Sequence, residues 1–423
     1  MITTSYHRFR SLVFVAIIVA FLYLLYSKLI ANNTSGPPYS LYAALKKQEQ
    51  KTARKFLESL QLIEAQKDNP KFVLFRQQEG LDFGSQACYA QEILLYHHLA
   101  LQGNRIFIYQ PFEWKSRKEQ LPLSAFLLGV TQERAVPSSF VEELCPKTSI
   151  DVARLKVDLS QPEMWKSTIN TLQKRKETCI IMSNPIIDSN FLSSPAGHSV
   201  WPLFQKYVAR YFRWSTQVLD IVDRTHTHLD LRRHFYSLEG EPYMVLHLRR
   251  GDFHKQCKTI AQQQLGFTKW NTLPAISSAT LFPRLNPANA TSVMDHCYPS
   301  LSRIMEAIDQ QAHRKPHIRA LHIIHDDAAS VTDIWKLETA LKSKQRAELY
   351  GWPYGPMKSI THSGMVPYQA NEQDFSVGVD VEMARRAEVF IGNGYSSLTS
   401  YIVAMRLGGD VVASGISDDI TLL

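Results

Sequence analysis

The chain has 423 residues, well above the usual length of one domain, so its length predicts two globular units. Hydrophobic residues make up 45% and charged residues 20%, which excludes a chain that is disordered throughout. The 47 Lys and Arg against 39 Asp and Glu give a net charge of +8. This excess suits an anionic ligand but is far from the charge of a nucleic-acid-binding tail, so no nucleic-acid partner is predicted.

The N-terminus contains a run of uncharged, mostly apolar residues from 12 to 26, preceded by two arginines and a histidine. Basic residues before such a run are the positive-inside pattern of a membrane anchor. We therefore expect a cytosolic tail at 1–11 and a transmembrane signal anchor at 12–31. A cleaved signal peptide is the alternative, but no small-x-small cleavage site follows closely.

Residues 32–70 are predicted to form a stem that begins with Pro, Gly, Ser and Asn and continues as a helix over 41–66. Glycosylation sequons occur at Asn32 or Asn33 and at Asn289, and they are usable only in the secretory lumen.

From residue 71 the chain alternates short apolar strands with helices, which predicts the α/β class with parallel sheets covered on both faces. The pattern runs twice, so we expect two Rossmann-like domains, at 71–238 and 239–423. The middle segment 121–177 contains several prolines and is expected to form long loops with short helices. Strands are expected at 72–75, 105–109, 178–182, 243–248, 319–325 and 388–391. Helices are expected at 87–101, 201–238, 298–312 and 396–406.

Ligands of open α/β sheets bind at the carboxyl ends of strands, so the turns that follow strands are the first places to search. The first such turn is Glu79-Gly80-Leu81-Asp82-Phe83-Gly84-Ser85-Gln86, where glycines permit close backbone approach before a helix N-terminus. The turn matches neither GxGxxG nor GxxxxGK[ST], which counts against a dinucleotide oxidoreductase and a P-loop kinase or sulfotransferase. Alone, it is equally typical of an ordinary βα turn.

The second turn is His247-Leu248-Arg249-Arg250-Gly251-Asp252-Phe253. Arginine forks match phosphate oxygens in bidentate geometry, and alternation along the strand puts His247 and Arg249 on one face. An internal Arg–Asp salt bridge at a domain seam is the alternative interpretation.

The third turn, Gly392-Asn393-Gly394-Tyr395-Ser396-Ser397, joins a strand to a helix. Hydroxyls, backbone N–H groups and the positive helix end would converge there on a phosphate. A simple helix cap is the alternative, because Ser is favoured at that position.

Taken together, GxxFGSQ, HLRRGDF and FIGNGYSSLTS resemble the GDP-fucose O-fucosyltransferase superfamily, in particular its fungal membrane-anchored members. The resemblance covers residues 72–413. It implies a GT-B-like fold with two Rossmann-like domains facing across a cleft, the first on the acceptor side and the second on the nucleotide-sugar side. It also implies transfer of fucose from GDP-fucose with inversion, without an obligatory metal and without a cofactor.

The resemblance also assigns roles to residues. Arg249 would hold the β-phosphate and stabilise the leaving diphosphate. His247 would lie beside the nucleotide, and Ser396 and Ser397 would bind phosphate from the opposite wall. The other expected nucleotide-sugar contacts are Gly84, Ser85, Gln86, Asp326, Gly392 and Asn393. Asp326 or its neighbour Asp327 is also a candidate helix cap.

The acceptor base implied by the resemblance is Glu79. The spacing after Glu79 departs from the family pattern, which makes Asp82 a competing carboxylate, and Leu398 stands where the family usually has Phe. These departures favour a second hypothesis, a catalytically inactive lumenal binding protein on the same fold. A secretory sulfotransferase ranks last because the P-loop is missing. The acceptor, a protein or a glycan, stays open, and the expected location is the Golgi or endoplasmic reticulum membrane.

Other polar clusters have simpler interpretations. His97 and His98 are expected to pack in a helix, and His226 with His228 is not expected to be a metal site. Asp380-Val381-Glu382 is the nearest approach to the Asp-x-Asp of metal-dependent transferases, and no metal site is predicted. Of the five cysteines, none of which forms a CxxC pair, Cys257 and Cys297 are the first expected disulfide, because a loop separates them in a lumenal domain.

Overall fold

The computed structural model describes residues 39–64, 70–75, 86–114, 119–145, 150–151, 163–182, 187, 189–233, 237–277, 284–325, 330–408 and 419–423. The expected anchor at 12–31, the first turn from Glu79 to Ser85, and Asp326 lie outside these residues, and Gln86 is described by its backbone alone. None of the described helices has the length and apolar character needed to cross a membrane.

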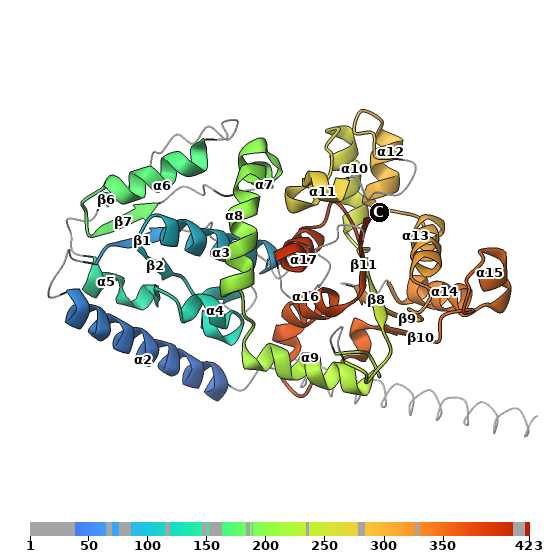
Figure 1. Ribbon diagram of the computed structural model, residues 1–423, viewed down its shortest axis with the longest axis horizontal. Coiled ribbons are helices and arrows are strands. Elements are labelled where there is room, and N and C mark those ends of the chain that lie inside the picture. The colour runs from blue at the N-terminus through green and yellow to red at the C-terminus, as the bar shows by residue number, and fades with distance from the viewer. Residues whose placement is uncertain are drawn as a thin grey trace, which may run out of the picture.

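Two five-stranded parallel sheets form the two halves of the molecule (Figure 1). The sequence pattern predicts parallel sheets and three of the five strands in each. The first has the order β5-β2-β1-β7-β6 and the second β10-β9-β8-β11-β12. The first sheet comprises β1 (Phe72–Phe75), β2 (Ile106–Tyr109), β5 (Ala135–Pro137), β6 (Ile150–Asp151) and β7 (Cys179–Met182). The second comprises β8 (Tyr243–Leu248), β9 (Ala320–His325), β10 (Ser359–His362), β11 (Val389–Gly392) and β12 (Ile420–Leu422).

Helices surround both sheets, and a short antiparallel hairpin follows β2. The hairpin strands are β3 (Phe112–Trp114) and β4 (Glu119–Leu121). Helices of the first half and the connection are α2 (Tyr39–Glu64), α3 (Gln86–Gln102), α4 (Leu128–Thr131), α5 (Val141–Leu144), α6 (Met164–Lys174), α7 (Ser189–Ser193), α8 (Pro195–Tyr211) and α9 (Thr216–His228). Those of the second half are α10 (Phe253–Gln262), α11 (Pro274–Ser277), α12 (Ala290–Cys297), α13 (Leu301–Arg314), α14 (Val331–Leu341), α15 (Lys344–Leu349), α16 (Ser376–Arg386) and α17 (Ser397–Gly408).

The helix expected in the stem is part of the folded unit. Ala53 and Leu57, one turn apart on α2, are buried with Phe72 and Leu74 of β1. Side chains alternate along a strand, so Val73 and Phe75 point to the opposite face, where α3 packs. The helical prediction for this segment is therefore confirmed, but the helix covers one face of the first sheet because it has an apolar stripe to bury.

The proline-bearing middle segment contributes two strands that the sequence analysis assigns to loops. Strand β5 pairs with β2, and β6 pairs with β7, both in parallel. They have only three and two residues, and β5 ends in Pro137, so neither shows the apolar run or the alternation by which a strand is recognised.

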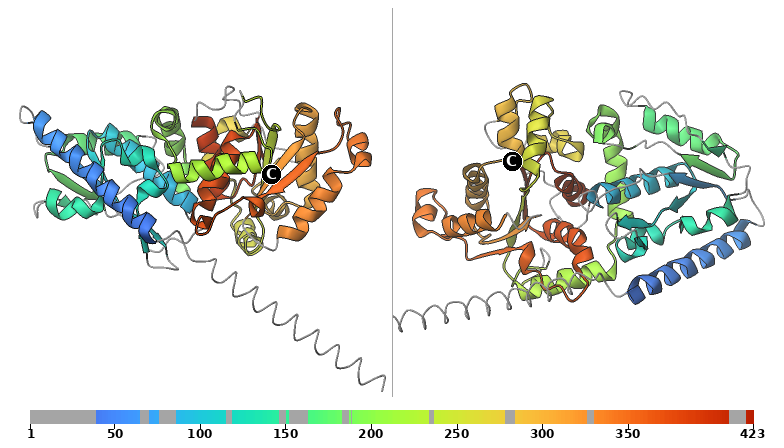
Figure 2. Two further views of the ribbon diagram at one scale, coloured as in Figure 1. Left: turned by 90° about the horizontal axis from the view of Figure 1, so that it is seen from below. Right: turned by 180° about the vertical axis from the view of Figure 1, so that it is seen from behind.

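The two halves share buried contacts. Helix α8 lies between them and packs on α3 and α17 (Figures 1 and 2). The Trp214 indole donates to the Glu382 carboxylate at 3.1 Å, and the Tyr42 hydroxyl of α2 donates to Asp374 at 2.9 Å. These bonds join residues more than 150 positions apart, so side chains of the first half fix elements of the second.

Two disulfides connect the described cysteines. The expected pair Cys257–Cys297 is confirmed, and it joins α10 to α12 next to the turn that follows β8. A second disulfide, Cys145–Cys179, joins the residue after α5 to the start of β7. The sequence does not predict this second pair, because its partners are brought together only by the pairing of the sheet.

We therefore expect intact-mass measurement of the unreduced protein to find one free thiol among the five cysteines. Reduction before alkylation should raise the number of labelled thiols to five. Five labelled thiols without reduction would contradict both disulfides, and three would contradict one of them, which peptide mapping would identify.

Candidate nucleotide-sugar site

The second and third sequence turns meet at the centre of the second sheet. Strand order reverses between β8 and β11, which makes this pair of neighbouring strands the topological switch point where ligands of open α/β sheets bind. Ile391 pairs with Leu246, so Gly392 follows beside His247. The sheet therefore brings the HLRRGDF and GNGYSS turns to one edge.

His247 fixes the distance between β8 and α17. Its side chain is 2% exposed, and its Nδ1 lies 2.8 Å from the Thr399 hydroxyl of α17. Burial, with a smaller effect from the nearby Arg249 charge, lowers the pKa of His247 to about 3, so the ring is neutral at physiological pH. The structure thus gives His247 a positioning role that the strand pattern alone does not show.

Arg249 directly follows β8 and keeps part of its guanidinium accessible. Its side chain is 23% exposed and is paired at 2.8 Å with Asp252, which is 83% exposed. The guanidinium also lies 4.9 Å from the centre of the Phe253 ring. A pair with so exposed a partner contributes little to stability, and Arg249 also donates to the Arg250 carbonyl at 3.3 Å.

Arg250 is instead a structural residue. Its side chain is 5% exposed, its Nε donates to Asp333 at 2.8 Å, and its Nη2 donates to the Pro299 carbonyl at 3.0 Å. The sequence allows two interpretations of the paired arginines, an anion site and an internal salt bridge, and each arginine fits a different one. Arg250 forms the internal salt bridge, and Arg249 is the residue that faces outward.

The turn after β11 has no room for side chains at its glycines. A Cβ at Gly392 would lie 2.6 Å from the Thr399 methyl, and one at Gly394 would lie 2.4 Å from the Phe267 ring. Between them, Asn393 is 1% exposed and donates to the Cys297 carbonyl at 2.7 Å. Asn393 thus holds the turn against α12 and is a buried structural residue.

The paired serines have different tasks. The Ser396 hydroxyl accepts the Leu398 N–H at 3.3 Å and caps α17, as the simpler interpretation predicts. The Ser397 hydroxyl accepts from the Lys269 ammonium at 3.1 Å. The cation and this hydroxyl therefore lie together at the positive end of α17, where the turn predicts a phosphate site.

Lys269 is the residue of this site that sequence reasoning missed. It begins the 3-10 helix η4 (Lys269–Thr272), has a positive φ of 56° and is 5% exposed. Its backbone N–H donates to the Ser193 hydroxyl at 2.6 Å. Nothing in the local sequence marks this lysine, because η4 lies outside all three motifs.

The helix that follows the first sequence turn, α3, contacts the start of α17. Gln91 of α3 donates to the Ser397 carbonyl at 3.2 Å and accepts from the Ser400 hydroxyl at 3.3 Å. Gln86 begins α3 one and a half turns earlier, so the N-terminal part of α3 lies against that of α17. Glu79, Gly84 and Ser85 precede this point and stay predictions.

His97 has the packing role expected of it, and His226 is also buried. His97 contacts the Tyr207 hydroxyl at 2.7 Å and the Glu133 carbonyl at 2.6 Å, and burial lowers its pKa to about 4. His226 is bonded to Tyr243 in the core. In the part of the chain that the structure describes, no three His, Cys, Asp or Glu side chains gather as metal ligands.

Comparison with known proteins identifies a fold. No protein-family model and no curated protein matches the sequence. Among solved structures, POFUT1 in complex with GDP-fucose aligns with a TM-score of 0.52 at 14% identity, over 84% of this chain and 98% of POFUT1. The apo form gives 0.51 at 15% identity, over 81% and 96%. The chain shares the fold of POFUT1. The GT-B-like arrangement of two α/β units expected from the motifs is thereby confirmed.

The division between Arg249 and Arg250 is testable with a matched pair of variants. Arg250→Met would leave Asp333 and a buried carbonyl unpaired, so we expect it to lower stability by about 3 kcal/mol. Arg249→Met should cost less than about 1 kcal/mol, since its partner is exposed. Denaturant unfolding of both variants measures the difference. Equal losses would contradict the assignment of Arg250 as the structural residue.

Proposed function

We propose that this protein is a glycosyltransferase that moves fucose from GDP-fucose to a hydroxyl of a protein or glycan acceptor. The observation that supports this most is the group at the switch point of the second sheet, where Arg249, Lys269 and the N-terminus of α17 occupy neighbouring turns. These groups suit a diphosphate, and POFUT1, which shares the fold, has been crystallised with GDP-fucose.

The proposed chemistry needs positive charge where the leaving group forms. When the bond between the fucose anomeric carbon and the β-phosphate oxygen breaks, its electron pair stays on that oxygen. Arg249 would stabilise the new charge from the end of β8, and Lys269 with the N–H groups of α17 would do so from the other wall. Such preorganised groups can act without a metal ion.

On the acceptor side, a carboxylate would take the proton as the acceptor hydroxyl attacks the anomeric carbon. Attack opposite the leaving diphosphate inverts the configuration of that carbon. The candidates for this base are Glu79 and Asp82. Both follow β1 in the sequence, and β1 is a strand of the first sheet.

A location in the secretory pathway is part of the proposal. Two disulfides suit an oxidising lumen, and the hydrophobic run at 12–26 follows basic residues, as in a type II anchor. The catalytic part would then face the lumen of the Golgi or endoplasmic reticulum.

Thermal-shift measurements on the full-length protein with GDP, UDP and CMP sugars test the donor. We expect GDP and GDP-fucose to raise the melting temperature, because a ligand that binds only the native state stabilises it. Arg249→Met should weaken GDP-fucose binding at least tenfold, since a hydrogen bond to a charged group is worth about 1.5–3 kcal/mol. The proposal would be contradicted if GDP left the melting temperature of the wild-type protein unchanged. GDP-fucose binding without release of GDP in the presence of acceptor would favour an inactive binding protein.

Lys269→Met tests the phosphate site separately from the nucleoside site. We expect GDP affinity to fall roughly tenfold or more, since the ammonium beside Ser397 is removed, while guanosine affinity stays unchanged. Titration calorimetry with both ligands measures the two effects, and unfolding controls for the loss of a buried side chain. An equal loss for guanosine would mean that Lys269 acts on the fold and not on the phosphates.

A further inference from the structure

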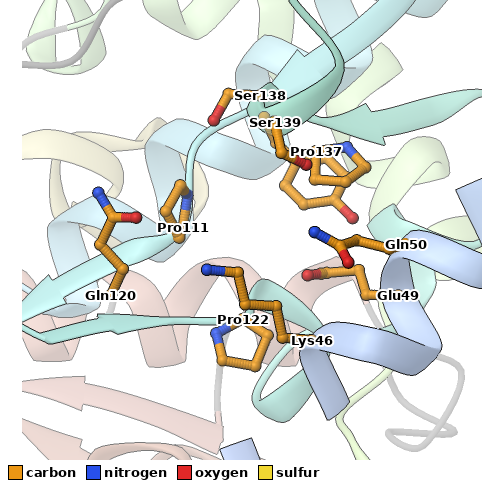
Figure 3. A pocket seen from close by; sticks show the side chains of 10 residues that line it. Lys46, Glu49, Gln50, Pro111, Gln120, Pro122, Pro137, Ser138 and Ser139 are labelled. Carbon is orange, nitrogen blue, oxygen red and sulfur yellow. The ribbon is translucent and has the colours of Figure 1, made fainter. Parts of the chain in front are cut away.

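A cavity of about 160 Å³ lies between α2 and the first sheet (Figure 3). Three of its lining residues are prolines, and six of the others have polar or charged side chains that reach it from α2, the hairpin and the strand ends. The lining residues are Lys46, Glu49, Gln50, Tyr109, Pro111, Gln120, Pro122, Pro137, Ser138 and Ser139. We call this cavity the α2 pocket.

The α2 pocket lies at the carboxyl edge of the first sheet. Tyr109 ends β2 and Pro137 ends β5, and these two residues are paired. Leu74 of β1 pairs with Ile108, so the end of β1 is one strand spacing, about 4.8 Å, from the end of β2. The proposed acceptor base follows β1. The pocket is therefore on the side of the sheet where an acceptor would approach.

Glu49 gives the α2 pocket a fixed carboxylate. It is 8% exposed, accepts the Ser124 N–H at 3.1 Å and is bonded to the Tyr109 hydroxyl. Burial raises its pKa despite these bonds. The side chain is thus anchored to two elements of the first half, and it presents oxygen to the pocket without needing to move.

Opposite charge is supplied from the same helix. Lys46 is one turn before Glu49 on α2, and Figure 3 shows its side chain extending toward Pro111 and Gln120. One cation and one carboxylate give the lining no net charge. An anionic ligand such as a nucleotide is therefore not favoured here, unlike at the site with Arg249.

The lining suits a molecule with many hydroxyls and small apolar faces. Carboxylate, amide and hydroxyl groups can accept from and donate to vicinal hydroxyls, and proline rings offer flat apolar surface between them. A cavity of roughly 150 Å³ holds one six-membered ring such as benzene. The α2 pocket has this volume and is open, so substituents of a larger ring can extend from it.

We propose that the α2 pocket binds a neutral sugar ring of the acceptor, which makes the acceptor a glycan. That the sugar belongs to the acceptor rests on the proposed function. That the ligand is a neutral sugar rests on the residues that line the pocket. A peptide presenting Ser or Thr is the competing occupant. It would need hydrophobic recesses for its side chains, whereas the apolar part of this lining is three prolines and the ring of Tyr109.

Saturation-transfer NMR with the full-length protein and neutral methyl glycosides of glucose, galactose, mannose and N-acetylglucosamine tests the ligand class. At least one glycoside should bind saturably. Lys46→Met and Gln120→Ala should each weaken that binding about fivefold or more, because each removes a hydrogen-bonding group of the lining. Lys47→Met is the matched control, an exposed lysine on the same helix that does not line the pocket, and it should bind like wild type.

Three results would overturn the inference. These are no glycoside binding at millimolar concentration, equal binding by the Lys46→Met and Lys47→Met variants, or a Ser/Thr peptide whose binding alone depends on Lys46.

Donor binding is measured in parallel, so that the two proposals can fail separately. Lys46→Met should bind GDP-fucose with wild-type affinity, because the α2 pocket is built from the first half alone. If glycoside binding depends on Lys46 but the protein does not bind GDP-fucose, the α2 pocket is supported as a sugar site and the proposed donor is wrong. If the protein binds GDP-fucose but no glycoside, the proposed donor is supported and the proposal that the α2 pocket binds a sugar is wrong.

Discussion

The first turn of α17 is held by hydrogen bonds from three other parts of the chain, and the geometry of the candidate site depends on them. His247 reaches it from β8, Asn271 holds the Gly394 and Ser396 carbonyls from η4, and Gln91 holds Ser397 from α3. Each bond contributes only about 1 kcal/mol net. Because they come from both halves, however, the orientation of the helix end is fixed before any ligand arrives. A helix end that is already oriented stabilises an anion without the cost of rearrangement.

The arginines of the chain have different surroundings, and most of those that are buried hold the backbone. Arg105 donates to four backbone carbonyls, Arg406 to three, and Arg250 is paired with Asp333. These guanidiniums hold chain segments together and have little capacity left for a ligand. Arg249 differs because its side chain is 23% exposed and its pair with Asp252 is open to water. The net charge of +8 therefore does not show which cations a ligand could reach, whereas the exposure of each ion pair does.

The sequence predicts the parallel sheets and the meeting of the HLRRGDF and GNGYSS turns, because apolar strands and the edge rule for parallel sheets are local patterns with few alternatives. It does not predict β5, β6, β10 and β12, which have two to four residues and are too short to show a period. It also does not predict Cys145–Cys179, which depends on the pairing of the sheet. Lys269 is missed for a similar reason. Its role depends on the hydrogen bond between Lys269 of η4 and Ser397 of α17, which are 128 residues apart in the sequence.

Helix α2 shows how a correct local prediction can miss a structural role. Its lack of Gly and Pro predicts a helix, and its position after a hydrophobic run suggests a stem. The structure instead buries Ala53 and Leu57 of this helix against one face of the first sheet. A chain beginning at β1 would expose Phe72, Leu74 and Ile106 to water and would lose Lys46 and Glu49 from the α2 pocket. Stability of the first half and recognition at its carboxyl edge thus depend on the same helix. A variant that loosens α2 should then affect both together, whereas Lys46→Met, which leaves the apolar stripe intact, separates them.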